Sequence, residues 1–149
     1  MRDLEDIDTI GVVGAGTMGS GIAQVAATNG YDVVMRDIRT EFVENGFDTI
    51  EDSLDRFVGK EKMTESDAEA ALDRITGTTA LDDLADCDVV VEAAVEDMDV
   101  KQDIFTDLDE AVPDDVLLAT NTSTLSITTI ASATDREDEV VGLHFMNPV

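Results

Sequence analysis

The sequence predicts an α/β fold in which a mainly parallel sheet is covered by helices on both faces. Short runs that are apolar along most of their length, such as 9–13, 88–94 and 116–120, alternate with segments whose apolar residues recur at helical spacing. Strands buried on both faces have this continuous apolar pattern, and their alternation with helices favours parallel pairing. The length of 149 residues is that of one domain.

The first half of the chain is expected to hold three strands and three helices after an acidic lead-in. The pair at 29–30, Asn-Gly, supplies a left-handed stop for the first helix. Thr40 can cap the second helix, which Gly59 ends, and Ser66 with Glu69 matches a capping box at the start of the third. In order, we expect a strand at 9–13, a helix at 17–28, a strand at 31–37, a helix at 40–59, a helix from 66 to 75 and a strand at 75–79.

The second half is expected to continue the alternation. It opens with an acidic turn or single helical turn at 81–88, and Pro113 closes the helix that contains Val100. We expect strands at 88–94, 116–120 and 140–144.

Three glycines between the first strand and the first helix have the G-x-G-x-x-G spacing. Gly14 suits a tight turn with positive φ, Gly16 leaves no Cβ in the way of a pyrophosphate, and Gly19 allows the helix to pack closely on its strand. The amides that open the helix, at Thr17 and Met18, would face the phosphates with the positive end of the helix dipole behind them. The motif alone is common, but its position between strand and helix predicts a Rossmann-type, doubly wound, dinucleotide-binding fold.

Asp37 ends the second strand, 18 residues after Gly19. Dinucleotide-binding folds place an acid there on the adenosine ribose, where it would repel the 2′-phosphate of NADP, so NAD is favoured. Arg36 and Arg39 flank this acid and keep NADP open as an alternative. A helix cap or a solvated carboxylate is the other interpretation of Asp37, and the order of strand, glycines, helix, strand and acid argues against it.

The chain is unusually acidic, with 35 acidic residues against 9 basic ones and a net charge of −26. The acids are spread along the whole sequence, which predicts a solvated surface whose self-repulsion is destabilising unless salt screens it. We therefore expect adaptation to a salt-rich cytoplasm, as in halophiles. The same field disfavours nucleic acid as a partner.

The cysteine and amino-terminal patterns indicate a cytoplasmic location. Cys87 is the only cysteine, which excludes an internal disulfide and fits a reducing compartment, and we interpret it as a small buried apolar residue. The first six residues are acidic where a signal peptide would be basic, and no apolar run reaches membrane-spanning length. We predict no membrane partner and no metal site.

Two polar stretches follow predicted strands in the second half of the chain. The stretch 120–126 comes after a buried strand, and the stretch 142–148 contains the only histidine, His144. Ligands of open parallel sheets bind beyond the carboxyl ends of the strands, so both stretches should lie on the same edge as the glycine turn. A hydroxyl, a histidine and a dinucleotide would then share one crevice.

Four segments, in this order, resemble the 3-hydroxyacyl-CoA dehydrogenase family and specifically its amino-terminal NAD-binding domain: GAGTMGSGIAQ, VVVEAAVEDMDVK, ATNTSTLSIT and GLHFMNPV. The resemblance runs essentially over residues 10–149. It implies that a 3-hydroxyacyl-CoA is oxidised to the 3-ketoacyl-CoA with NAD, or the reverse reduction, a reaction of β-oxidation in fatty acid metabolism. Residues 1–149 would be the NAD-binding domain, without the carboxyl-terminal helical domain of the family.

The resemblance also implies roles for single residues. His144 would be the base that takes the hydroxyl proton as hydride leaves C3 of the substrate, a role that suits an imidazole near neutral pH. Ser123 would hydrogen-bond the reacting oxygen, and the alternative for it is an ordinary turn serine. Asn147 would line the nicotinamide end of the cofactor.

Further positions match family contacts to the cofactor and to CoA. Glu96 and Lys101 match cofactor contacts, with Glu92 at the strand end as the neighbouring alternative to Glu96. Ser53 and Lys60 match contacts to CoA, and the alternative for both is a solvated helix face.

In the family, a glutamate shortly after the Asn-Pro segment holds the catalytic histidine, and the helical domain supplies an active-site asparagine and dimer contacts. The 149 residues stop before both. We therefore expect NAD binding with weak or no turnover by this chain alone, because the loss of an orienting carboxylate costs orders of magnitude. A homodimer, or association with the helical domain, would complete the site. The alternatives are a non-catalytic dinucleotide-binding module and another NAD-dependent hydroxyacid dehydrogenase.

Overall fold

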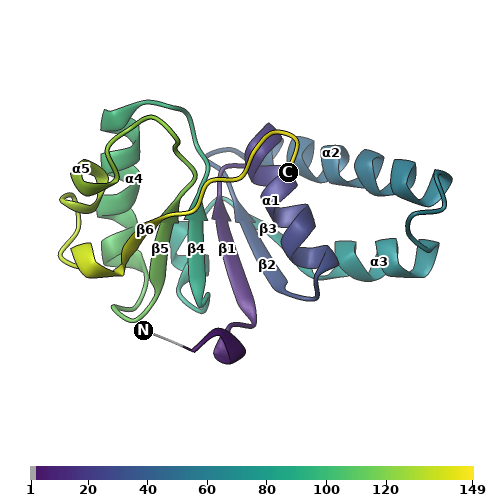
Figure 1. Cartoon of the computed structure of the whole chain (residues 1–149), viewed down its shortest axis with the longest axis horizontal. Coiled ribbons are helices and arrows are strands. Elements are labelled where there is room, and N and C mark those ends of the chain that lie inside the picture. The colour runs from purple at the N-terminus through teal and green to yellow at the C-terminus, as the bar shows by residue number, and fades with distance from the viewer. Residues whose placement is uncertain (1–2) are drawn as a thin grey trace.

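The structure, a computed structural model, describes residues 3–149 as a parallel six-stranded sheet in the order β3-β2-β1-β4-β5-β6 (Figure 1). The strands are β1 (Thr9–Val13), β2 (Asp32–Arg36), β3 (Ile75–Thr78), β4 (Val89–Glu92), β5 (Leu117–Thr120) and β6 (Val140–Gly142). The helices are α1 (Thr17–Thr28), α2 (Thr40–Gly59), α3 (Glu65–Asp73), α4 (Met98–Ala111) and α5 (Ile127–Ala131), with 3-10 turns at η1 (Leu4–Asp6), η2 (Leu81–Leu84) and η3 (Glu137–Glu139).

Helices cover both faces of the sheet, as the continuous apolar strands predict. Val12 of β1 belongs to a core shared with α1, α2 and α3, whereas its neighbour Val13 belongs to a second core shared with α4 and α5. In β4 the same alternation puts Val91 in the first core and Val90 in the second. The predicted doubly wound α/β fold is confirmed, and chain order reverses between β1 and β4, where such folds bind ligands.

Two predicted helix caps were wrong. α3 begins at Glu65 because Thr64 is its N-cap: the Thr64 backbone is extended and its hydroxyl accepts a hydrogen bond from the Asp67 amide at 3.1 Å. Ser66, the predicted cap, lies inside the helix. In α2, Arg39 has the extended N-cap backbone and forms no side-chain cap bond, so Thr40 is the first helical residue.

The second half differs from the prediction at two points. The five-residue helix α5, capped by the Ser126 hydroxyl on the Thr129 amide at 3.2 Å, was not predicted because it is too short to show a period. β6 ends at Gly142 instead of 144. The acidic turn at 81–88 does contain a helical turn, η2.

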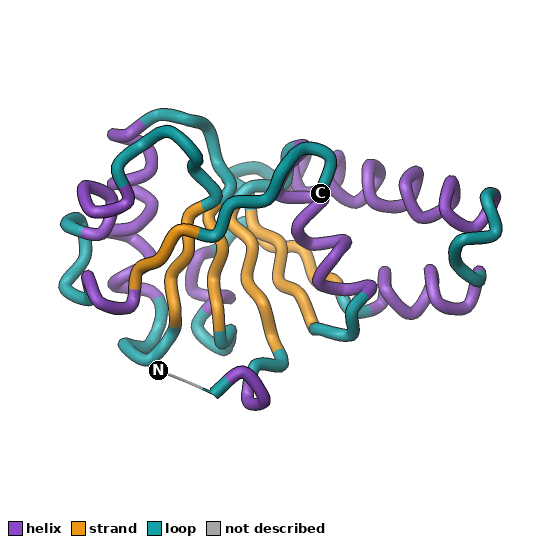
Figure 2. Tube along the Cα trace, in the orientation of Figure 1, coloured by secondary structure: helices purple, strands orange, loops and turns teal. Residues whose placement is uncertain are grey.

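After β6 the chain crosses the carboxyl ends of the strands toward α1, as the yellow segment of Figure 1 and the loops of Figure 2 show. The Leu143 amide donates to the Thr120 carbonyl at 2.9 Å, and the Phe145 amide donates to Asn121 Oδ1 at 2.7 Å. At the far end, a Cβ on Gly21 of α1 would lie 2.9 Å from Cγ2 of Val149. This crossing brings residues 144–147 from the sheet edge to the glycine turn.

Cys87 is a buried core residue, as predicted, with 1% of its surface exposed. Burial, with the neighbouring Asp86, raises the pKa of the Cys87 thiol to about 11. The thiol therefore stays protonated at neutral pH and behaves as a small apolar group.

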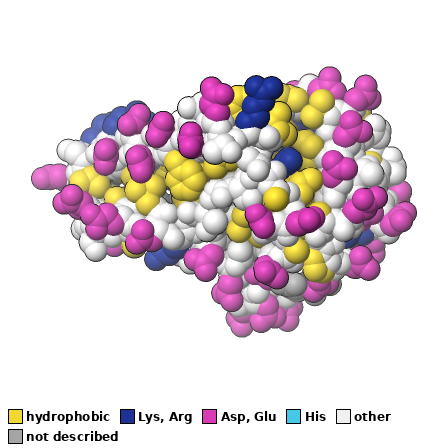
Figure 3. Space-filling model, turned by 180° about the vertical axis from the view of Figure 1, so that it is seen from behind, with side chains coloured by type: hydrophobic (Ala, Val, Ile, Leu, Met, Phe, Trp, Pro, Cys, Tyr) yellow, Lys and Arg dark blue, Asp and Glu magenta, His cyan; other side chains and the backbone are white. Residues whose placement is uncertain are grey.

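Acidic side chains are scattered over the molecular surface, as the face in Figure 3 shows. None of the helices within residues 3–149 combines the length and apolar character that crossing a membrane requires. Over the same residues, no group of three or more His, Cys, Asp or Glu side chains is arranged to hold a metal ion.

Candidate active site

The glycine turn between β1 and α1 has the backbone geometry that its spacing predicts. Gly14 has φ of +110°, and a Cβ there would lie 2.7 Å from the Ala93 carbonyl oxygen. A Cβ on Gly19 would lie 1.8 Å from the Gly14 carbonyl oxygen, so α1 rests directly on the turn. Gly16 differs, because a Cβ there would meet no atom of residues 3–149 within 4 Å. Gly16 therefore faces open space, where a phosphate can approach the backbone.

The amino terminus of α1 suits an anion. Its N-cap is Gly16, which has no side chain to accept from the first amides of the helix. Such amides are ready donors to a phosphate. Thr17 and Met18 follow and line different cavities: Thr17 lines a cavity between α1 and α2, and Met18 lines a smaller cavity at the carboxyl edge of the sheet.

Asp37 lies against the glycine turn. Its Oδ2 accepts from the Ala15 amide at 2.8 Å and its Oδ1 accepts from the Ile38 amide at 2.7 Å. The carboxylate therefore braces the turn from the end of β2. The two flanking arginines have other partners: Arg36 Nε donates to the Thr79 carbonyl at 3.1 Å, and the Arg39 guanidinium lies 5.6 Å from the centre of the Phe42 ring.

The smaller cavity, of about 220 Å³, lies where the loops after β4, β5 and β6 meet. Ser123 comes from the loop after β5, and His144 comes from the segment after β6; both side chains are exposed. The six predicted site residues that line this cavity are Met18, Glu96, Lys101, Ser123, His144 and Asn147. The structure thus brings the proposed base and the proposed hydroxyl donor to one cavity beside α1.

Lys101, which lines this cavity, belongs to a buried ion pair. Lys101 and Glu92 are 1% and 0% exposed, and Lys101 Nζ lies 2.6 Å from Glu92 Oε1. Glu92 also accepts from the Ala94 amide and the Thr120 hydroxyl, each at 2.7 Å. The structure therefore gives Glu92 a place in the protein interior, whereas Glu96 lines the cavity.

Glu96 contacts Lys101 from the solvent side. Its Oε1 lies 3.2 Å from Lys101 Nζ, and 49% of its side chain is exposed. Its Oε2 accepts from the hydroxyls of Thr122 at 2.8 Å and Thr124 at 3.1 Å. Desolvation by burial raises the pKa of Glu96, but the hydrogen bonds from Thr122 and Lys101, the charge of Lys101 and the bond from Thr124 outweigh it. The pKa of Glu96 is therefore lowered, and the group is ionised at neutral pH.

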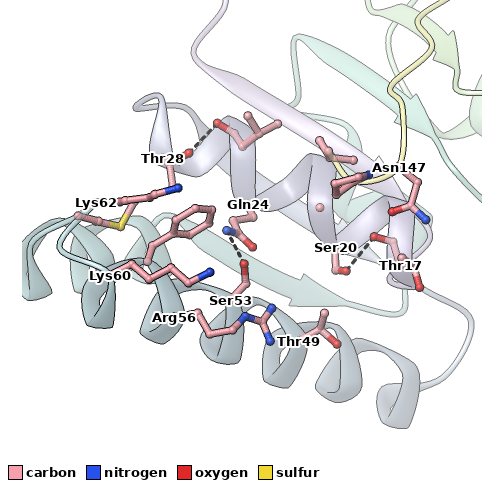
Figure 4. Close-up of a pocket in the computed structure, with 16 residues that line it drawn as sticks. Thr17, Ser20, Gln24, Thr28, Thr49, Ser53, Arg56, Lys60, Lys62 and Asn147 are labelled. Carbon is pink, nitrogen blue, oxygen red and sulfur yellow. Dashed lines mark hydrogen bonds between the residues drawn. The ribbon is translucent and has the colours of Figure 1, made fainter.

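The larger cavity, of about 560 Å³, lies between α1 and α2 (Figure 4). Ser53 and Lys60, the residues predicted to contact CoA, both line it, and Gln24 Nε2 donates to Ser53 Oγ at 3.0 Å. Asn147 lines both cavities, so the two adjoin at the crossing segment.

Two cations of the larger cavity were not predicted. Arg56 and Lys62 line it with Lys60; in Figure 4, Lys60 and Lys62 lie toward the end opposite Asn147, and Arg56 lies nearer the middle. The signal for Arg56 was in the sequence, because Ser53, Arg56 and Lys60 recur at i, i+3 and i+7, which puts them on one face of a helix. The cavity thus gathers three of the chain's nine basic residues.

A doubly wound parallel sheet with this glycine turn after β1 and an acid at the end of β2 defines a Rossmann-type dinucleotide-binding protein. The model of the family described as "3-hydroxyacyl-CoA dehydrogenase, NAD binding domain" matches residues 9–149. The chain belongs to this family and contains its NAD-binding domain, so the resemblance inferred from the four segments is confirmed.

Similar proteins and solved structures agree with this family assignment. The chain is 48% identical over 143 residues to 3-hydroxybutyryl-CoA dehydrogenase of Bradyrhizobium diazoefficiens, which covers 96% of this chain and 49% of that protein. It is 41% identical over 148 residues to the fatty acid oxidation complex subunit alpha of Psychrobacter cryohalolentis, covering 99% of this chain and 21% of that protein. The crystal structure of (S)-3-hydroxybutyryl-CoA dehydrogenase from Ralstonia eutropha matches with a TM-score of 0.95 and 50% identity over 97% of this chain and 51% of that one. The chain thus spans about half the length of the 3-hydroxybutyryl-CoA dehydrogenases it matches.

Proposed function

We propose that this chain is the NAD-binding half of a dehydrogenase that interconverts 3-hydroxyacyl-CoA and 3-ketoacyl-CoA in fatty acid oxidation. The observation that carries the proposal is the placement of Ser123 and His144 in one cavity next to the glycine turn, joined through Asn147 to a cavity rich in cations. The relatives named 3-hydroxybutyryl-CoA dehydrogenase favour a short acyl group.

The backbone of the turn fits NAD. The open face of Gly16 and the uncapped amides of α1 would hold the pyrophosphate, and Asp37 would take the adenosine ribose. Glu96, Lys101 and Asn147 would lie toward the nicotinamide end. When bound, NAD supplies the hydride acceptor for C3 of the substrate.

The two exposed side chains would handle the substrate oxygen. Ser123 would hydrogen-bond it, holding C3 in position. As the C3–H hydride leaves and the C=O bond forms, the hydroxyl proton would pass to the His144 imidazole; in the reverse reduction, His144 would return it. No metal is needed for this proton transfer.

The α1–α2 cavity would receive CoA. The phosphates of CoA need cations or hydrogen-bond donors, and on a chain of net charge −26 most of the surface repels them. Arg56, Lys60 and Lys62 supply cations to the lining of the cavity, and Ser53 supplies a hydroxyl. Arg56 and Lys62 therefore strengthen the prediction made for Ser53 and Lys60.

Calorimetry on the 149-residue polypeptide tests the proposal. We expect NADH to bind, acetoacetyl-CoA to bind to the NADH complex, and Lys60→Met to weaken acetoacetyl-CoA without weakening NADH. We also expect weak turnover, because no carboxylate of residues 3–149 forms an ion pair with His144. If the chain is a non-catalytic module, it will bind NADH but no acetoacetyl-CoA. If it is a dehydrogenase of free hydroxyacids, it will turn over acetoacetate. Robust turnover of acetoacetyl-CoA would contradict the prediction of weak activity.

We also propose that the chain is adapted to a salt-rich cytoplasm. Its stability should rise steadily from low to multimolar KCl, because salt screens the repulsion among 35 acidic residues. Urea unfolding at each salt concentration measures this. A matched variant removes four exposed acids of α4, Asp99, Asp103, Asp107 and Glu110, by change to the corresponding amides. The variant should respond less to salt, and a salt-independent stability of the natural chain would refute the adaptation.

We propose, finally, that the chain associates as a homodimer or with a helical carboxyl-terminal domain. Val141, Leu143 and Met146, along and after the edge strand β6, are 37%, 42% and 77% exposed, so apolar surface lies open beside a strand edge that is unpaired within residues 3–149. Sedimentation should show a dimer, and Leu143→Asp should dissociate it. If the chain is a monomer with or without this change, the homodimer is refuted and the helical carboxyl-terminal domain is the remaining partner.

A further inference from the structure

The carboxylate of Glu96 connects the loop after β4 to the loop that carries Ser123. Its Oε2 accepts from the hydroxyls of Thr122 and Thr124, the two residues that flank Ser123 in the chain. Its Oε1 lies 3.2 Å from Lys101 Nζ. One carboxylate therefore contacts the residue on each side of the proposed hydroxyl donor while being held by a buried cation.

The anchor of this connection is buried. Lys101 is tied to Glu92, which is fully buried and in register with Thr120 across β4 and β5. The Thr120 hydroxyl donates to Glu92 Oε2, so the last paired residues of both strands share one network. Glu96 extends that network from the sheet into the cavity.

Glu96 orients the hydroxyl of Thr122, and this hydroxyl holds the backbone of the loop that carries Ser123. An ionised carboxylate can only accept, so the single hydroxyl proton of Thr122 points toward Glu96. The lone pairs of the Thr122 oxygen are then free to accept from the amides of Thr124 at 3.4 Å and Leu125 at 3.2 Å. These two bonds join the residue before Ser123 to the two residues after it, and so fix the turn that carries Ser123. Thr122 is 5% exposed, so water does not readily substitute for these partners.

We propose that Glu96 is a positioning residue, which acts through Thr122 and Thr124 to hold Ser123 at the reacting oxygen of the substrate. This inference rests on the proposed function, because the position of Ser123 matters to chemistry only if its hydroxyl binds that oxygen. It differs from a direct cofactor contact, since the effect passes through Thr122. A positioning effect of this kind is costly to lose, as a displacement of about 1 Å can reduce a rate by roughly 100-fold.

The test compares Glu96→Gln, Thr122→Val, their double variant and the conservative Thr122→Ser in the 149-residue chain. Glu110→Gln is the matched control: the same change at an exposed position of α4. Three quantities are measured: amide hydrogen exchange at residues 124 and 125, the affinity for NADH, and, with NADH present, the preference for acetoacetyl-CoA over butyryl-CoA. Butyryl-CoA lacks the C3 oxygen, so this preference reports on the hydrogen bonds made to that oxygen, which include the one from Ser123.

We expect Glu96→Gln and Thr122→Val each to speed exchange and to lower the preference by about tenfold, the worth of one hydrogen bond. The double variant should add little to either, because both act on one interaction. Thr122→Ser and Glu110→Gln should match the natural chain, and Thr122→Val should leave NADH affinity unchanged.

The proposal is overturned if Glu96→Gln weakens NADH binding while Thr122→Val changes neither exchange nor preference, since Glu96 then acts as a cofactor contact alone. It is also overturned if Glu96→Gln and Thr122→Val speed amide exchange at residues 124 and 125 but leave the preference for acetoacetyl-CoA over butyryl-CoA unchanged. If the natural chain binds no acetoacetyl-CoA, the proposed function fails, and unchanged exchange in Glu96→Gln would separately refute the hold of Glu96 on the loop.

Discussion

Gly19→Ala is expected to destabilise the domain and to abolish NADH binding. The new Cβ would lie 1.8 Å from the carbonyl oxygen and 2.5 Å from the carbonyl carbon of Gly14. These are backbone atoms of the glycine turn, so no side-chain rotation relieves the clash. Either α1 must move off β1 or the turn must open, and overpacking of this kind costs about 3 kcal/mol or more.

Two other glycines separate the effect on binding from the effect on folding. Gly16→Ala meets no atom of residues 3–149 within 4 Å and has φ of −75°, so it should fold normally yet bind NADH more weakly, because its methyl group occupies the space left for a phosphate. Gly59→Ala, also in open space at the end of α2, should change neither property. Thermal unfolding and NADH titration measure both quantities. A Gly19→Ala variant with the melting temperature and NADH affinity of the natural chain would contradict the close packing of α1 on the turn.

The features that the sequence predicted well are those fixed by local chemistry. Gly14 and Gly19 follow from the backbone demands of a strand turning into a packed helix, and these demands act over a few residues. The buried strands follow from continuous apolar runs, and the burial of Cys87 follows from its place between η2 and β4. The start of α3 was missed because Thr64 and Ser66 are both good caps, and local sequence does not decide which of them has the extended backbone.

The features that were missed depend on contacts between distant segments. Glu92 and Thr120 are bonded over 28 positions, and this pair exists only because β4 and β5 are in that register. Lys101 lines the cavity, and its contact with the cofactor stays a prediction; its ion pair with Glu92 was not predicted, because nothing in the sequence shows that the start of α4 turns the ammonium group back toward a strand carboxylate. Likewise, the spacing of Ser53, Arg56 and Lys60 shows only that they share a helix face, and the cavity that they line exists because α2 packs beside α1.

Lys101→Met is expected to lower the free energy of unfolding by about 3–5 kcal/mol, because it leaves the Glu92 carboxylate buried without its cation. Glu92 is 0% exposed, so water cannot take the place of the Lys101 ammonium group. For a domain of this size, such a loss lowers the melting temperature by roughly 10 °C. Calorimetry or circular dichroism on heating measures it.

Two variants show whether the buried charge is the cause. Lys62→Met removes the same charge from an exposed residue, so it corrects for the more negative net charge and should melt close to the natural chain. Glu92→Gln combined with Lys101→Met removes both buried charges and should recover most of the lost stability, because the amide oxygen can still accept from the Ala94 amide and the amide NH2 can donate to the Thr120 hydroxyl oxygen. If Lys101→Met melts within a few degrees of Lys62→Met, the ion pair contributes little to folding. The burial of Lys101 would then have to be explained by its contact with Glu96 at the cavity, which is the side on which the cofactor is proposed to bind.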